Sequence, residues 1–521
     1  MFKGKKRIGG VALSFLLTVS VLTGCSKPTS KTNTESQVQQ KSSIVFNGER
    51  SLYNLELVLD TDKKELKGHE TVKFKNNYNE SLKELVFHLY PDSYNSAETK
   101  PSIGGKIQEL KEEEIGDIKI NSLKVNGKSL IYTEDKQILK VILDKDLKSG
   151  ETIDVAMDFT LKIPQGRDRL GYMGKQYSLT NWYPILSIYN EKIGTWDENP
   201  FHPVGESNYS DCSDYNVTVS VPKDTVVAAT GVKVSEERGK AVDRITFEAV
   251  NNRDFVLFFS KDYKVLTKEV DGIKVNSYYF SYKSTAERML ELACESVKFF
   301  NSTYGKYPYP EYDVVESYLD GGAMEYPTVT QMGPYQRLSE DYSNDRLTFF
   351  DEAVVHETAH QWWFSTVGNN EFKEPILDES FTAYSTALFF EKVFGEYNPM
   401  AVKAAFLSMP IGEGGSKPIY RSTDTFTWQD FGRVVYILGP IVLEDLRQKV
   451  GEEKFIDVFK TYYERYKFKN ATLDGFLEVV KEKCGKETSD YIRKAFNDKN
   501  YSNDKLLISE DEVIKIQEEL K

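Results

Sequence analysis

The hydrophobic residues of this chain change their spacing near residue 275, and this change limits the folds that the chain can adopt. Before residue 275 apolar and polar side chains alternate, as in half-buried β-strands, for example at 53–60, 153–161 and 215–221. After it, apolar residues recur at helical spacing around 284–303, 346–364, 379–393, 434–450, 452–466 and 472–484. We therefore predict a multi-domain α+β fold, in which an antiparallel β-sandwich or saddle precedes a mostly helical domain.

Length and charge narrow the functional classes. The chain has 521 residues, of which 40% are hydrophobic and 13% aromatic, enough for two or three globular domains with large cores. Its formal net charge of −13 argues against a surface that binds nucleic acid. We expect no nucleic-acid partner.

The first 25 residues have the pattern of a targeting segment. Lys3, Lys5, Lys6 and Arg7 precede an apolar stretch that ends in Leu-Thr-Gly-Cys at Cys25. This stretch is shorter than the ~20 apolar residues of a spanning helix. It resembles a bacterial lipoprotein signal, which implies cleavage before Cys25, lipidation of the Cys25 thiol and an extracytoplasmic location on the cell membrane. An uncleaved N-terminal anchor is the alternative.

Four segments follow from these patterns. Residues 1–24 are the predicted signal peptide, 25–44 a flexible polar tether, 45–275 the N-terminal β domain and 276–521 the mostly helical second domain. The remaining cysteines, Cys212, Cys294 and Cys484, have no metal-ligand spacing. We expect buried thiols, and one disulfide stays possible.

The motif that carries chemistry is His356-Glu357-Thr358-Ala359-His360. Residues four apart lie on one face of a helix, so both imidazoles can bind one metal ion, and Glu357 can reach a water on that ion. One Zn²⁺ fits such ligands and can lower the pKa of a bound water to about 7. With 5 histidines and 80 acids in 521 residues, chance gives about 0.007 acidic versions of this motif.

A third protein ligand has to come from a neighbouring helix, and Asp378 and Glu379 are downstream candidates. The spacing of His356, His360 and Glu379, with eighteen residues between His360 and Glu379, resembles that of the gluzincin aminopeptidases, the family of aminopeptidase N and leukotriene hydrolase. The resemblance implies a thermolysin-like catalytic domain with Glu379 as the third zinc ligand. Asp378 then occupies a position where the family more often has Asn.

Two further segments resemble this family. Gly322, Ala323, Met324 and Glu325 match its G-A-M-E-N stretch, although Tyr326 replaces the Asn. The resemblance implies that this stretch binds substrate and that Glu325 binds the free α-amino group. A carboxylate there favours an ammonium over an uncharged amide, and glycines allow a peptide backbone to approach.

The second of these two segments contains Tyr436 and resembles the family's Y-E-K-G, with Ile437 and Leu438 in place of Glu and Lys. It implies that Tyr436 donates its hydroxyl to the oxyanion of the tetrahedral intermediate. Segments at 52–57, 68–72, 87–91, 181–184, 230–231 and 252–255 resemble the family's N-terminal saddle, so the match runs from about residue 50 to 500.

Together these features predict a zinc aminopeptidase that removes N-terminal residues from peptides at the outer face of a bacterial membrane. Glu357 is the expected general base and Tyr436 the oxyanion donor, with zinc on His356, His360 and Glu379. Two alternatives remain: a thermolysin-like endopeptidase, and a catalytically inactive lipoprotein that only binds partners at the surface.

Overall fold

The computed structural model describes residues 44–101, 109–335, 348–395 and 417–501, and single positions at 511, 514, 515 and 518. The predicted signal peptide, Cys25 and nearly all of the predicted tether lie outside these residues. Among the described residues, no helix is long and apolar enough to cross a membrane.

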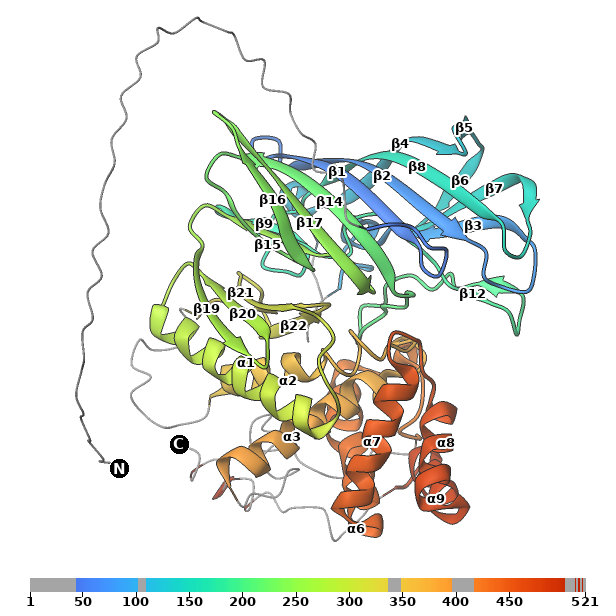
Figure 1. Cartoon of the computed structure of the whole chain (residues 1–521), viewed down its shortest axis with the longest axis vertical. Coiled ribbons are helices and arrows are strands. Elements are labelled where there is room, and N and C mark those ends of the chain that lie inside the picture. The colour runs from blue at the N-terminus through green and yellow to red at the C-terminus, as the bar shows by residue number, and fades with distance from the viewer. Residues whose placement is uncertain are drawn as a thin grey trace, which may run out of the picture. The chain divides into compact units, whose positions relative to one another are not determined.

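An eight-stranded sheet dominates the N-terminal half, as the alternating pattern predicts (Figure 1). Its strands are antiparallel to their neighbours except for β1 and β14, which pair in parallel. A parallel pair needs a long crossover connection, and these two strands are far apart in the sequence. The strand order is β16 (Val232–Arg238), β17 (Val242–Asn252), β14 (Ser213–Pro222), β1 (Leu52–Asp60), β2 (Glu65–Lys75), β8 (Thr152–Lys162), β4 (Asp117–Val125) and β5 (Lys128–Ser129).

Smaller sheets complete this half, together with the 3₁₀ turns η1 (Tyr90–Asn95) and η2 (Glu112–Glu114). Inward-facing residues of the large sheet and of these sheets share one hydrophobic core, which contains Trp182, Tyr183 and Tyr215. The strands of the smaller sheets, in order, are β15 (Val226–Ala229), β18 (Leu257–Ser260), β10 (Gln176–Leu179) and β9 (Gly171–Met173); β11 (Ile185–Leu186), β3 (Leu82–His88), β7 (Ile138–Leu147) and β6 (Tyr132–Asp135); and β12 (Tyr189–Asn190) with β13 (Thr195–Trp196).

A five-stranded sheet begins the second half. Its order is β19 (Lys264–Val270), β20 (Ile273–Tyr279), β21 (Glu311–Glu316), β23 (Val329–Met332) and β22 (Ala323–Tyr326), so β22 is the last strand at one edge. The predicted division between residues 275 and 276 falls inside β20. The described residues from 44 onward belong to one compact unit.

Helices make up most of the remaining described chain (Figure 1). Five predicted segments are close to observed helices, and the predicted 434–450 divides into a π-helical turn and a helix. The sequence analysis missed the short α5 and the amphipathic α9. The helical elements are α1 (Lys283–Thr303), α2 (Phe349–Ala359), η4 (Ile376–Ser380), α3 (Phe381–Phe394), η5 (Thr423–Thr425), α5 (Trp428–Arg433), η6 (Val434–Leu438), α6 (Gly439–Val450), α7 (Glu452–Tyr466), α8 (Leu473–Cys484) and α9 (Lys486–Asn497).

These elements confirm the predicted fold class, a β-rich first part followed by a mostly helical second part. The second part has its own large core, in which Trp362, Trp363 and Phe381 are fully buried. Cys212, Cys294 and Cys484 are all free thiols, the first two buried and the third half-buried.

Candidate metal centre and catalytic cleft

Helix α2 carries His356 and is capped by His360, and its N-terminus is fixed by side-chain contacts. The Thr348 side chain accepts a hydrogen bond from the Asp351 N–H, and the Asp351 carboxylate accepts one from the Thr348 N–H at 2.6 Å. This reciprocal pair satisfies two N–H groups that a helix start leaves unpaired. Arg288 of α1 also binds the Asp351 carboxylate through two nitrogens, at 2.6 and 2.9 Å.

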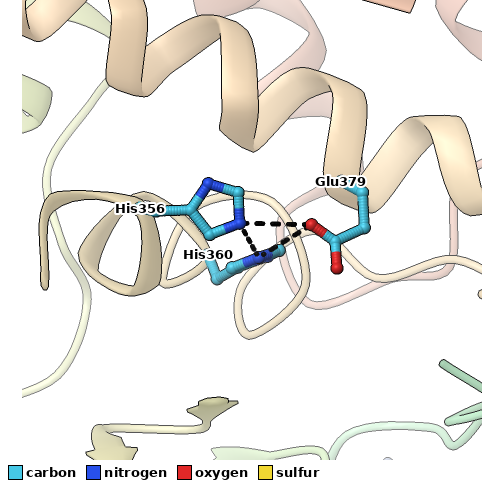
Figure 2. Close-up of side chains that lie close together, drawn as sticks. All are labelled: His356, His360 and Glu379. Atoms are coloured by element: carbon cyan, nitrogen blue, oxygen red, sulfur yellow. Dashed lines mark hydrogen bonds and ion pairs between the residues drawn. The ribbon is translucent and has the colours of Figure 1, made fainter. Parts of the chain in front are cut away.

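The two histidines and Glu379 point toward one another (Figure 2). His356 Nε2 lies 3.2 Å from His360 Nε2 and 3.2 Å from Glu379 Oε2, and His360 Nε2 lies 3.5 Å from the same oxygen. Helix α2 ends at Ala359, so His360 is the residue that caps it. Its N–H still bonds to the His356 carbonyl, which keeps both rings on one face.

These distances suit zinc. Zinc–nitrogen bonds of about 2.0–2.1 Å at tetrahedral angles place two ligand atoms roughly 3.3–3.4 Å apart. Two neutral imidazoles and one carboxylate are a donor set that zinc accepts, with a fourth position left for water or substrate. His356, His360 and Glu379 therefore fit a single zinc ion.

Glu357 lies beside this centre without belonging to it. The side chain is buried and lines the same hollow as His356, and its Oε2 has no hydrogen-bond partner among the described residues. Burial raises the pKa of Glu357 to about 8, and His360 partly opposes that shift. A carboxylate with such a pKa is suited to exchange a proton near neutral pH.

Glu379 and Tyr436 both lie on π-helical turns, η4 and η6. The Tyr436 hydroxyl donates a hydrogen bond to Glu379 Oε1 at 2.5 Å, and the Tyr436 ring stacks near His356 with centroids 5.8 Å apart. Tyr436 also lines the hollow. Its hydroxyl is thus held at the metal centre.

Asp378 contacts one of the candidate metal ligands, which the sequence analysis did not predict. Its Oδ1 lies 2.7 Å from His360 Nδ1, the ring nitrogen that faces away from the other ligands. A carboxylate at this nitrogen fixes the orientation of a metal-binding imidazole and increases its basicity. Asp378 is therefore a supporting residue of the centre, and its position next to Glu379 was the only sequence signal.

A hollow of about 160 Å³ borders the centre. Ala323 and Met324 of edge strand β22 line it, as do His356, Glu357 and Tyr436. Gly322, directly before this strand, has a φ of +125°, and a side chain there would come within 2.7 Å of the Phe349 ring. The strand edge therefore offers main-chain groups to an extended peptide beside the metal ligands.

Glu325 belongs to a group of buried acids. Single carboxylate oxygens of Glu325, Glu371 and Asp378 lie within 4.8 Å of one another, and Glu325 is equally close to Glu357 and His360. Burial raises the pKa of both Glu325 and Glu371 well above the ordinary value. The Asn208 N–H donates to Glu371 at 2.8 Å.

The N-terminal half supplies a buried ion pair to the wall of the hollow. Arg169 and Glu206 both line it and form two bonds with each other, of which Nη2–Oε1 measures 2.6 Å. The sequence analysis missed this pair and Glu371. No spacing relates them to the His-Glu-x-x-His segment, because strands and loops far apart in the chain bring them together.

The segment that contains His356, Glu379 and Tyr436 resembles a known peptidase family. Residues 288–496 match the Peptidase family M1 domain. Aminopeptidase M1-B of Oryza sativa subsp. japonica is 23% identical over 70% of the chain and 42% of its own length. Aminopeptidase N of Lactococcus lactis subsp. lactis is 21% identical over 72% of the chain and 48% of its own length. The chain thus spans less than half the length of these curated relatives.

Solved structures share the fold over more of their length. The crystal structure of an M1 zinc metallopeptidase from Deinococcus radiodurans aligns with a TM-score of 0.60 at 19% identity, covering 87% of this chain and 94% of that one. A mutant of the Deinococcus enzyme bound to a Tyr-Ser-Ala substrate aligns with a TM-score of 0.59 at 18% identity, covering 87% and 96%.

Proposed function

Because the chain carries a peptidase family M1 domain over residues 288–496, we propose that it is a zinc-dependent aminopeptidase that removes the N-terminal residue of peptides. The observation that carries this proposal is the convergence of His356, His360 and Glu379 within zinc-ligand distance, beside the buried carboxylate of Glu357.

The residues around the centre have distinct tasks in this proposal. A zinc ion held by these ligands supplies a Lewis acid and lowers the pKa of a bound water. Glu357 accepts the proton of the attacking water and returns it to the leaving amine. Tyr436 donates its hydroxyl to the oxyanion of the substrate, in keeping with its place at Glu379.

Substrate position follows from β22. Ala323 and Met324 line the hollow and, with Gly322 directly before them, present main-chain groups to the peptide backbone, and Glu325, the next residue of β22, binds the substrate's α-ammonium. An ammonium can remain charged beside buried carboxylates, whereas an uncharged amide leaves them without a partner. This position makes the enzyme remove one residue at a time from the free end.

The proposal is tested with a fluorogenic amino-acid amide and its N-acetyl derivative. We expect wild-type protein to bind one zinc ion and cleave only the free amine, and a chelator to abolish cleavage until zinc is restored. Glu357→Gln is expected to keep the zinc and lose turnover. Cleavage of the acetylated substrate would indicate an endopeptidase, and no cleavage of either with zinc bound would indicate a binding lipoprotein.

We also propose that the protein acts outside the cytoplasm, attached to the membrane by a lipid on Cys25. The basic start, the short apolar stretch and Leu-Thr-Gly-Cys support this proposal. Wild-type protein should partition into detergent with the membrane fraction, and Cys25→Ala should not acquire the lipid. The proposal would be contradicted if Cys25→Ala carried the same added lipid mass as the wild-type protein and partitioned into detergent to the same extent.

A further inference from the structure

The two π-helical turns carry the functional side chains Glu379 and Tyr436, one each. Turns of this kind are rare, occur mostly as single insertions in α-helices and are frequent at functional sites. If such a turn relaxed to an ordinary α-helical turn, every side chain after it would rotate around the helix axis. Contacts with the surrounding structure must therefore hold the π-helical turn in place. The contacts between η4 and η6 therefore decide where the two side chains meet.

One side chain joins the two turns directly. The Ser380 hydroxyl donates a hydrogen bond to the main-chain carbonyl of Val435 at 2.6 Å, and both residues are fully buried. Ser380 directly follows Glu379, and Val435 directly precedes Tyr436. The bond thus connects the chain at the metal ligand to the chain at the tyrosine.

Gly439 makes this connection possible. Its φ of −57° and ψ of −53° are helical, so the backbone conformation does not require glycine. A Cβ at this position would lie 2.1 Å from Ser380 Oγ and 2.7 Å from Ser380 Cβ. Glycine is therefore needed for space, because it lets the end of η6 pack directly against Ser380.

We infer that Ser380 and Gly439 form a clamp between the turns, and that Ser380 is a positioning residue for Tyr436. The clamp fixes η6 so that the Tyr436 hydroxyl remains at Glu379, where its hydrogen bond measures 2.5 Å. A displacement of about 1 Å at a reacting group can cost roughly 100-fold in rate. The inference rests on the proposed role of Tyr436 in catalysis.

The test is a double-mutant cycle on the zinc-loaded enzyme. Ser380→Ala removes one hydrogen bond, and we expect kcat to fall roughly five- to tenfold at unchanged KM. Tyr436→Phe removes the oxyanion donor, and we expect a fall of roughly 100-fold. If Ser380 acts through Tyr436, Ser380→Ala/Tyr436→Phe has the same kcat as Tyr436→Phe alone.

Ser489→Ala is the matched control. Ser489 is also buried, and its hydroxyl donates to the Leu477 carbonyl at 2.8 Å, joining α9 to α8 away from the cleft. We expect it to lower the thermal midpoint about as much as Ser380→Ala while leaving kcat unchanged. A comparable loss of kcat in Ser489→Ala would identify the effect as general destabilisation and overturn the inference.

Two further outcomes separate the inference from the proposed function. If Tyr436→Phe lowers kcat and the effect of Ser380→Ala simply multiplies with it, Ser380 does not act through Tyr436. If Tyr436→Phe leaves kcat unchanged, the proposed role of Tyr436 itself fails.

A second pair of variants tests the clamp even if Ser380→Ala does not fold. Gly439→Ala places a methyl group against Ser380 and should lower kcat more than Gly439→Ala/Ser380→Gly, in which the obstructing atoms are gone. Equal kcat values in these two variants would contradict the clamp.

Discussion

At the residue scale, the proposed recognition of the substrate amine by Glu325 depends on the burial of its carboxylate. It is 3% exposed, and its Oε1 has no hydrogen-bond partner among the described residues. Glu325→Gln preserves shape and removes the charge, so we expect kcat/KM for a free-amine substrate to fall roughly 10- to 100-fold. Steady-state kinetics with the amide and a substrate whose amine is replaced by hydrogen provide the measurement and its control. An equal loss on both substrates would contradict recognition of the amine.

The burial of His88 leads to a second prediction, which concerns the pH dependence of the free energy of unfolding. Its ring is buried and stacks on the Tyr90 ring, with the ring centroids 4.8 Å apart. Neither ring nitrogen has a hydrogen-bond partner among the described residues. Burial lowers the pKa of His88 from 6.5 to about 4, although Asp197 and Glu198 oppose the shift. The unfolded chain therefore takes up the proton first as the pH falls. As the pH falls from 6.5 to 4, the titration of His88 should lower the free energy of unfolding by roughly 3 kcal/mol.

His88→Phe keeps an aromatic ring on Tyr90 and removes the titration. Urea unfolding at several pH values from 7.5 to 4 should show that the free energy of unfolding falls less steeply in the variant. The two proteins differ in slope only between the unfolded and folded pKa values of the histidine. Parallel curves throughout this range would show that His88 is protonated in the folded protein.

At the scale of elements, period and spacing predicted the long strands and helices but not their irregular turns. The predicted helix at 284–303 is nearly identical to α1, because its apolar stripe continues without interruption. η4 and η6 could not be predicted, since one extra residue in a turn leaves no mark in a 3.6-residue pattern. The convergence of His356, His360 and Glu379 was predictable because the two histidines lie within five residues and the glutamate fits the spacing of a known family. The pairing of Arg169 with Glu206 could not be predicted from the sequence, because it depends on tertiary folding.

The start of α2 supports a prediction at this scale. Asp351 is fully buried, caps the helix with Thr348 and binds Arg288 of α1 at 2.6 and 2.9 Å. Asp351→Asn keeps the size of the side chain but removes the negative charge that Arg288 contacts through two nitrogens. We expect the free energy of unfolding to fall by roughly 2 kcal/mol.

Urea unfolding of Asp351→Asn, Arg288→Gln and the double variant measures this coupling. The double variant should lose less stability than the sum of the single losses, because each single change leaves one half of the pair behind. Strict additivity would show that the two side chains contribute independently.

At the scale of the whole molecule, both halves of the chain contribute to the cleft. Arg169 and Glu206 of the N-terminal half line the hollow together with His356 and Tyr436. The N-terminal half also touches the chain before β22, where the Asp320 N–H donates to the Arg167 carbonyl at 3.0 Å. The β-rich half is therefore part of the site, and contacts between the halves should influence both stability and substrate binding.

Arg253 is the clearest of these contacts. It follows β17, and its guanidinium donates to the Lys469 carbonyl and to Asn470 Oδ1 between α7 and α8, both at 2.6 Å. A Cβ at Gly368 would lie 2.2 Å from Arg253 Cζ. Gly368→Ala should push the guanidinium off these acceptors and lower the free energy of unfolding by roughly 2–4 kcal/mol.

Non-additivity makes this last prediction specific. Arg253→Ala removes the obstructed side chain, so Arg253→Ala/Gly368→Ala should be about as stable as Arg253→Ala alone. Gly166→Ala is the control, since the nearest atom to its Cβ is Lys100 Nζ at 3.9 Å, and it should change stability by less than about 0.5 kcal/mol. Differential scanning calorimetry of the four variants gives the measurement. If the two losses add, the alanine at position 368 acts on something other than Arg253, and this bridge between the halves is not what requires the glycine.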